Sequence, residues 1–231
     1  MKRLYKEVSV IEVPEGFAVL LDGRPVMTPG RWQLVLPTHA LAAAIAAEWE
    51  AHGAHIRPDT MPLMQLAATV LDHVAIHRAA IEAATLRYAE TDTVCYRADA
   101  PLELVRLQRI TWDPLLDWLA EQHRVALAIS TGILPVAQAQ AALDGLSRIM
   151  AAMDDWRLCA FQAAVACSGS FVIALALTEG QIDAGDAFRA AEVDASFEID
   201  RWGEDAESTH RRRTVAADLA AARRFVELLG G

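Results

Sequence analysis

Two histidines spaced four residues apart could share one face of a helix and hold a metal ion between them. His73 and His77 have this spacing, and Asp72 beside them adds a carboxylate. Imidazole nitrogens and carboxylate oxygens are ordinary zinc ligands, and residues i and i+4 lie above one another on a helix. His52 and His55 form a second pair, but no third ligand follows at a recognisable spacing. We therefore expect no metal and no other cofactor, and keep His73 and His77 as an alternative.

A cysteine is the other candidate for chemistry. Cys95 would be a nucleophile if a base or a positive charge held it as a thiolate. Arg97 is near it in sequence, but no histidine is. Asp92 and the neighbouring threonines are suited to closing a turn between two helices by bonding local backbone. We predict a buried structural cysteine, with a thiol enzyme as the alternative.

The common catalytic signatures are missing from the sequence. It contains no phosphate-binding loop, no dinucleotide-binding glycine pattern, no H-E-x-x-H and no G-x-S-x-G. Each of these patterns carries a specific mechanism for phosphate, nucleotide, zinc or acyl chemistry. The sequence therefore predicts a protein that is not an enzyme.

An acidic segment with one tryptophan, from Phe197 to Glu207, has two interpretations. Glu198 precedes Trp202 by one helical turn, Gly203 can end a helix, and Glu204, Asp205 and Glu207 crowd the first turn of the next. Acids suit a helix N-terminus and glycine suits a helix C-terminus, so capping alone would account for the pattern. An acidic surface with an aromatic anchor would instead suit a protein partner. Spacing leaves both interpretations open.

Net charge bears on the class of partner, and cysteine usage bears on the cellular compartment. The 31 acidic and 21 basic residues give a formal net charge of −10, which disfavours nucleic acid and anionic membranes. The basic cluster 210–213 is adjacent to acids, and Glu207 stands four residues before Arg211, the favourable order for an ion pair on a helix. The three cysteines form no C-x-x-C pair, and no targeting segment is evident at the N-terminus. We expect a cytoplasmic protein that binds no nucleic acid.

One long apolar run resembles a membrane span. Residues 158–178 contain no charged side chain, and this length could cross a bilayer. Gln162, Ser168, Gly169 and Ser170 dilute the run, and it stands alone in the chain. A helix that is apolar on all sides also suits the centre of a helical bundle. We predict one buried central helix and no stable membrane insertion.

The sequence pattern changes from strand-like to helical along the chain. Strand-like sequence occupies residues 5–13, 17–21, 24–27 and 33–36, and Asp22-Gly23 is a two-residue hairpin signal. From Thr38, a predicted N-cap, the pattern is helical: a first helix with Leu41, Ile45 and Trp49 on one face is followed by one starting near Thr60. Further helices are predicted over residues 77–88, 102–111, 114–122, 137–153, 158–178, 184–202 and 205–229.

This order predicts an α+β fold. A small N-terminal domain, residues 1–80, would hold an antiparallel β-sheet with covering helices. A larger all-α helical bundle would form a second domain, residues 81–231.

Seven short blocks in the same order resemble the family of F1-ATPase α-subunit assembly chaperones, which occurs in mitochondria and in some bacteria. Each block is weak alone, but their order along the chain is specific. Met27, Met64, His52 and Glu198 depart from the residues expected of the family. The blocks are 21–25 with 28–29, 41–49, 56–63, 91–97, 108 with 112–115, 168–176 and 202–207.

The resemblance implies a molecular chaperone for ATP synthase F1 assembly in the bacterial cytoplasm. Such a protein would bind the unassembled α subunit and prevent its aggregation until the β subunit replaces it. As partner-binding residues we expect Glu198, Trp202, Gly203, Glu204, Glu207 and Trp49. A generic holdase without a preferred client, and an enzyme using His73, His77 or Cys95, are the alternatives.

Overall fold

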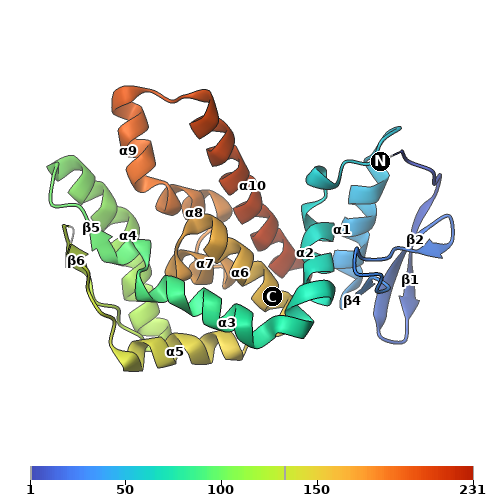
Figure 1. The fold of residues 1–231 in the computed structure, drawn as a ribbon, viewed down its shortest axis with the longest axis horizontal. Coiled ribbons are helices and arrows are strands. Elements are labelled where there is room, and N and C mark those ends of the chain that lie inside the picture. The colour runs from blue at the N-terminus through green and yellow to red at the C-terminus, as the bar shows by residue number, and fades with distance from the viewer. Residues whose placement is uncertain (1, 133, 231) are drawn as a thin grey trace. The chain divides into compact units, whose positions relative to one another are not determined.

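The computed structural model describes residues 2–132 and 134–230, and it confirms the predicted mixed fold (Figure 1). A small antiparallel sheet comes first in the chain, and helices dominate the remainder. By their contacts the residues form two compact units, each described by itself below. The first unit comprises Met1–Arg78, Asp155–Ala160 and Arg224–Gly231, and the second comprises Ala79–Asp154 and Phe161–Arg223.

The sheet of the first unit is built around its second strand. β1 (Val8–Val13) and β2 (Gly16–Leu21) form a hairpin, and β2 also pairs with β3 (Arg24–Pro25) and β4 (Val35–Leu36). The turn between β2 and β3 is the predicted one: Asp22 and Gly23 have φ values of 48° and 76°. Two consecutive positive φ angles give the twist that a tight hairpin needs, and Asp and Gly tolerate them.

Helix α1 (His39–Glu50) covers this sheet, contacting β1 and β2. Thr38 caps it as predicted, because its hydroxyl accepts a hydrogen bond of 3.2 Å from the backbone N–H of Leu41. Leu41 and Ile45 on its inner face are fully buried. The short helix η1 (Pro58–Thr60) and α2 (Pro62–Thr69) follow, and α2 continues into a π-helical turn, η2 (Val70–Val74).

Helices form most of the second unit, where α4 packs against α7, α8 and α9. The short η3 (Thr93–Cys95) precedes a two-stranded parallel ladder of β5 (Tyr96–Arg97) and β6 (Ser130–Thr131). The helices that follow α2 and η2 are listed here, and α3, α6 and α10 each have part of their length in the first unit: α3 (Ala75–Glu90), α4 (Leu102–His123), α5 (Gln140–Ala151), α6 (Asp155–Ser168), α7 (Phe171–Thr178), α8 (Ala184–Ala191), α9 (Val193–Trp202) and α10 (Ala206–Leu228).

The single helix predicted over residues 158–178 is wrong, because the chain breaks between α6 and α7. Gly169 has a φ of 68°, a left-handed conformation that ends a helix, and the hydroxyl of Ser170 caps α7 by accepting from the N–H of Ile173 at 3.0 Å. Every residue of α7 is buried, as the apolar run predicts. Among the described residues, no helix has the length and apolar character needed to cross a membrane.

Two other predicted helix boundaries are also wrong. Residues 102–111 and 114–122 form one helix, α4, with Pro114 inside it. Pro114 is exposed, so water can reach the carbonyl that its missing N–H leaves without a donor. The helix predicted over 184–202 is instead two helices, α8 and α9, which meet at Glu192, whose φ and ψ of −112° and 22° are not helical.

Candidate functional site

The turn between α9 and α10 presents the tryptophan that the sequence singled out. Trp202 ends α9 with 85% of its surface exposed. Gly203 caps the helix: its N–H bonds the carbonyl of Ile199 at 2.8 Å and its φ is 84°, a conformation open to glycine. Asp205 then caps α10, because its carboxylate accepts from the N–H of Ser208 at 2.8 Å. The predicted capping is therefore present, and it leaves the indole of Trp202 in solvent.

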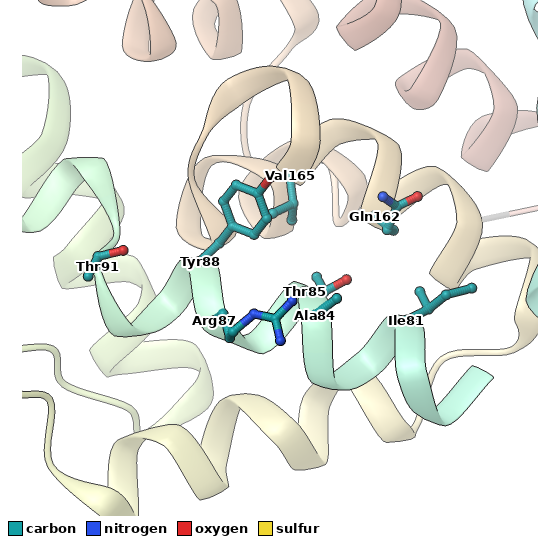
Figure 2. A pocket seen from close by; sticks show the side chains of 8 residues that line it. All are labelled: Ile81, Ala84, Thr85, Arg87, Tyr88, Thr91, Gln162 and Val165. Carbon is teal, nitrogen blue, oxygen red and sulfur yellow. The ribbon is translucent and has the colours of Figure 1, made fainter. Parts of the chain in front are cut away.

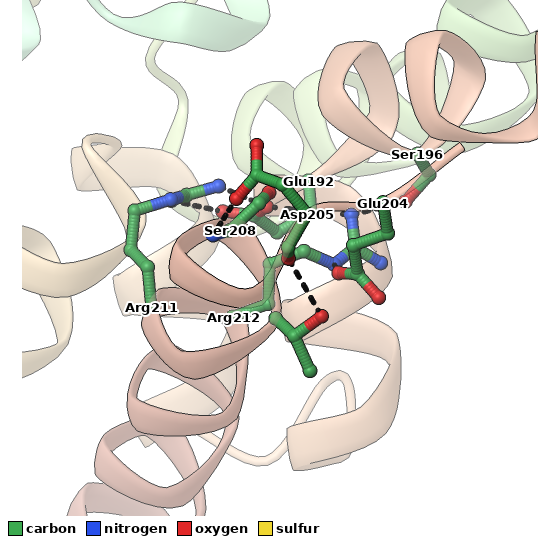
Figure 3. Close-up of polar contacts among 8 residues, drawn as sticks. Glu192, Ser196, Glu204, Asp205, Ser208, Arg211 and Arg212 are labelled. Atoms are coloured by element: carbon green, nitrogen blue, oxygen red, sulfur yellow. Dashed lines mark hydrogen bonds and ion pairs between the residues drawn. The ribbon is translucent and has the colours of Figure 1, made fainter. Parts of the chain in front are cut away.

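An ion-pair cluster holds the residues around this turn (Figure 3). The buried carboxylate of Glu192 accepts from both terminal nitrogens of Arg211, at 2.8 and 2.7 Å. Arg212 lies 3.5 Å from Glu192 and 3.3 Å from Glu204, so it bridges the start of α9 and the turn. The hydrogen bonds that Arg211 donates to Glu192 raise the pKa of Arg211. This cluster, which we call the Glu192 clamp, ties α10 to both ends of α9.

The Glu192 clamp changes the predicted role of the basic cluster. Arg211 bonds Glu192 and not Glu207, the partner that the i, i+4 spacing predicts. Glu198 and Glu207 stay exposed, and neither forms an ion pair within the described part of the chain. Glu204, by contrast, is held by Arg212. The geometry thus provides an exposed indole on a fixed turn, flanked by two free carboxylates.

A further ion pair holds the C-terminal end of α9 against α4. Arg201 of α9 bonds Glu103 of α4 at 2.8 Å and stacks on the ring of Phe197, 4.2 Å from its centroid. The residues next in sequence to this pair are Leu102 and Trp202, and both are exposed. The ion pair thus ties the end of α9 that carries Trp202 to the first turn of α4.

Trp49, the remaining predicted partner-binding residue, belongs to the first unit. It lies near the end of α1, half buried, with its ring in an edge-to-face contact with Tyr5 at a centroid distance of 5.8 Å. The hydroxyl of Tyr5 also donates to the backbone carbonyl of Trp49 at 2.6 Å. Trp49 lines a separate groove, discussed below, that the sequence pattern did not indicate.

The histidine pair lies close together in space. The rings of His73 and His77 have centroids 4.8 Å apart, and both side chains are exposed. Asp72 is engaged elsewhere, because it accepts hydrogen bonds from Thr28 and from the backbone N–H of Gly30. Within residues 2–132 and 134–230, no group of three metal-ligating side chains is assembled. The structure therefore places two imidazoles at this position as candidate metal ligands.

Cys95 is poorly placed for nucleophilic chemistry. It is fully buried, and burial, together with the nearby Asp92, raises the pKa of its thiol to about 12 in spite of Arg97. A thiol with this pKa is protonated at neutral pH and is a weak nucleophile. Asp92 closes the local turn as predicted, accepting from the N–H of Val94 at 3.2 Å. It also bonds Ser170 and Val172 of the distant α7 cap, which sequence alone did not indicate.

A groove of about 490 Å³ lies between α3 and α6 of the second unit (Figure 2). Arg87 and Tyr88 of α3 and Gln162 and Val165 of α6 are among its lining residues. Of the described residues that line it, Arg87 alone is charged, so the groove offers no acid and base pair for catalysis.

Comparison with known proteins gives consistent matches. Residues 2–120 match the family described as "ATP12 chaperone protein". The curated relative "Protein atp12, mitochondrial" of Schizosaccharomyces pombe is 25% identical over 215 residues, covering 87% of this chain and 74% of the relative.

Two solved structures are similar over almost the whole fold. The crystal structure of Atp12 from Paracoccus denitrificans has a TM-score of 0.94 and 39% identity, covering 99% of this chain and 98% of that one. The Atu1473 protein of Agrobacterium tumefaciens also has a TM-score of 0.94, with 34% identity, 99% coverage of this chain and 86% of that one.

Proposed function

This chain belongs to the ATP12 chaperone family and is an ATP synthase assembly chaperone, and from that premise we propose that it binds the unassembled α subunit of F1-ATPase. The proposed action is to prevent aggregation of that subunit until the β subunit replaces it. An isolated subunit of an assembly exposes apolar surface that its neighbours normally cover, and such surface drives aggregation. A chaperone that covers this surface reversibly would keep the subunit available.

The observation that carries the proposal, beyond the family, is Trp202. Trp202 is 85% exposed, and tryptophan is enriched among the residues that dominate binding energy at protein interfaces. Because the Glu192 clamp fixes the turn beneath it, little ordering would be needed on binding. This supports Trp202 as an anchor in the contact with the α subunit.

Acidic residues around the anchor would add selectivity. Glu198 and Glu207 are exposed and without ion pairs in the described structure, so they are available for basic groups on the partner. Glu204 would contribute while bonded to Arg212, and Gly203 would set the turn. Trp49 is proposed as a contact made by the first unit. Displacement by the β subunit would follow if both bind overlapping surface of the α subunit.

The proposed action requires no catalysis. The buried thiol of Cys95 and the exposed imidazoles of His73 and His77 supply no assembled catalytic set in the described residues. We further propose that the protein acts in the bacterial cytoplasm, binds no nucleic acid and does not insert stably in membranes. Its net charge of −10 and its similarity to proteins of Paracoccus denitrificans and Agrobacterium tumefaciens support this.

Capture of the purified, unassembled α subunit on the immobilised chain tests the proposal. We expect retention of the α subunit, a clear loss with Trp202→Ala, and weaker retention with the double variant Glu198→Lys, Glu207→Lys. The matched control reverses two exposed acids on the β1–β2 hairpin, Glu12→Lys and Glu15→Lys, which gives the same change in net charge.

The controls separate the alternatives. Equal weakening by both pairs of charge reversals would show a nonspecific effect of charge and would remove Glu198 and Glu207 from the proposed surface. Failure of the unmodified chain to retain the α subunit would refute the proposal itself. Equal retention of unrelated unfolded proteins would favour a generic holdase.

A further inference from the structure

A second surface that fits a protein partner lies in the first unit. It is an open groove of about 680 Å³ between the turn after β3, the end of α1, and α2 with η2. Its apolar lining includes Met27, Trp49, Ile56, Met61, Met64 and Ala68. A volume of this size accommodates several side chains or a small ligand.

Hydrogen bonds hold one wall of the groove in place. Asp72 of η2 accepts from the hydroxyl of Thr28 at 2.6 Å and from the N–H of Gly30 at 2.8 Å. The turn over residues 28–32 is also closed internally, by the bond from the N–H of Thr28 to the carbonyl of Trp32. A Cβ on Gly30 would lie 2.4 Å from the carboxylate of Asp72, so an added side chain would push this carboxylate out of its hydrogen bonds.

Hydrogen bonds also hold the end of α1 against the start of α2. Both carboxylate oxygens of Glu48 accept backbone N–H groups at the start of α2, from Leu63 and Met64, each at 2.9 Å. The ring of His52 bridges the carbonyl of Glu48 at 2.8 Å and the hydroxyl of Thr60 at 3.1 Å. The loop before α2 is thereby pinned to α1. With both walls fixed, the groove is preformed and a partner need not open it.

Methionines supply much of the apolar surface. Met27 is 49% exposed, whereas Met61 and Met64, which also line the groove, are buried. Methionine side chains are flexible and polarizable, which lets one site fit apolar side chains of different shapes. Such a lining suits a segment of protein better than one ligand of fixed shape.

The charge of the groove points to an uncharged occupant. Among the described residues, Asp72 and His73 are the ionisable ones in its lining, and both oxygens of Asp72 already accept hydrogen bonds. The lining therefore offers apolar surface and no free charge, which suits an uncharged apolar segment.

We propose that this groove, from Met27 to Trp49 and Met64, binds an uncharged apolar segment of the unassembled α subunit. The assignment rests on the proposed function and adds a contact surface on the first unit. A neutral groove on a chain of net charge −10 would take the apolar part of the client, while the acidic surface around Trp202 takes basic groups.

The test compares two exposed apolar residues of the same unit. Met27→Glu places a charge at the rim of the groove, and Ile11→Glu does the same on β1, where Ile11 is 43% exposed and does not line the groove. We expect Met27→Glu to weaken binding of the α subunit by about tenfold or more, because the charge must be desolvated, with Ile11→Glu unchanged.

A photoreactive methionine analogue at position 27 identifies the occupant directly. Cross-links to an apolar segment of the α subunit support the proposal. If the unmodified chain binds the α subunit but Met27→Glu and Ile11→Glu both bind like it, the groove assignment is wrong and the proposed function stands. If the unmodified chain does not bind the α subunit, both fail. Cross-links to a second copy of this chain would make the groove a self-association surface and overturn the assignment.

Discussion

Glu192 and Arg211 join two helices through a pair of hydrogen bonds of 2.8 and 2.7 Å, with the carboxylate buried and the guanidinium half exposed. The pair lies where α8 meets α9, and it ties this junction to the first turns of α10. A carboxylate removed from water needs such donors, and Arg211 and Arg212 supply them. The exposed Trp202 therefore lies next to a turn that the Glu192 clamp holds in place.

Glu192→Gln should weaken the Glu192 clamp. The variant replaces a charged acceptor by a neutral amide, and we expect the free energy of unfolding to fall by about 1–2 kcal/mol, because Arg211 is only half buried. Urea denaturation measures this change. Asp186→Asn is the control, because it breaks an exposed ion pair with Arg189 on the neighbouring helix and should cost less than about 0.5 kcal/mol. Equal effects of both variants would contradict the role of Glu192.

The stability of the protein should depend on pH through Asp92. Burial raises the pKa of Asp92 from its ordinary value of 3.8 to about 6. Between these values the folded chain keeps a proton that the unfolded chain has lost, so Asp92 contributes stability at low pH that disappears as pH rises through 6. We compare the free energy of unfolding of the unmodified protein with that of Asp92→Asn. The difference, unmodified minus variant, should be about 1 kcal/mol more positive at about pH 5 than at about pH 7.5.

Urea denaturation of both proteins at the two pH values checks this sign. Because the amide introduced by Asp92→Asn does not titrate, the difference between the proteins isolates the contribution of this group. A difference that is constant with pH, or larger at the higher pH, would show that the Asp92 pKa is not raised in the folded protein.

Gly30→Ala should strain the groove wall. The added Cβ would meet the Asp72 carboxylate at 2.4 Å, so either this carboxylate leaves its hydrogen bonds or the turn shifts, and we expect a loss of about 1–3 kcal/mol in the free energy of unfolding. Gly53→Ala is the matched control, since nothing lies within 4 Å of its Cβ and its φ is not positive. It should leave stability unchanged or raise it slightly. Thermal denaturation of both variants is the measurement, and a stable Gly30→Ala would show that the turn has room to adjust.

The thiols should be unreactive in the folded protein. Burial is the main cause that raises the pKa values of Cys95, Cys159 and Cys167 to about 12. Alkylation by iodoacetamide near neutral pH should therefore be at least about a hundredfold slower in the folded than in the unfolded chain. Mass spectrometry after timed alkylation reports each cysteine separately. One cysteine that reacts faster in the folded state would instead support the thiol-enzyme alternative.

Local sequence signals predicted the parts of the fold that depend on neighbouring residues. Asp22 and Gly23 specify a two-residue turn by their own tolerance of positive φ, and Thr38 caps the helix that starts one residue later. The break at Gly169 was missed because an apolar run with a few small polar residues fits one helix as well as two. The continuity of α4 through Pro114 depends on the exposure of that residue, which periodicity does not reveal.

The candidate sites depend on contacts between distant residues. Sequence spacing paired Arg211 with Glu207 four residues earlier, whereas the buried carboxylate that it bonds is Glu192, at the junction of α8 and α9. Met27 and Met64 were visible only as departures from the family pattern, and the fold brings both to one groove. Segments 155–160 and 224–231 belong to the first unit, and no local sequence pattern indicates this. The division into domains at residue 80 stays a prediction.

Aggregation of the refolding F1 α subunit, followed by light scattering as the chain is added, tests the central claim most directly. The account predicts that suppression saturates near an equimolar ratio for the α subunit, and that the same amount of chain leaves aggregation of the β subunit and of an unrelated refolding protein unchanged. Equal suppression of all three clients, or no suppression of the α subunit at any ratio, would contradict it.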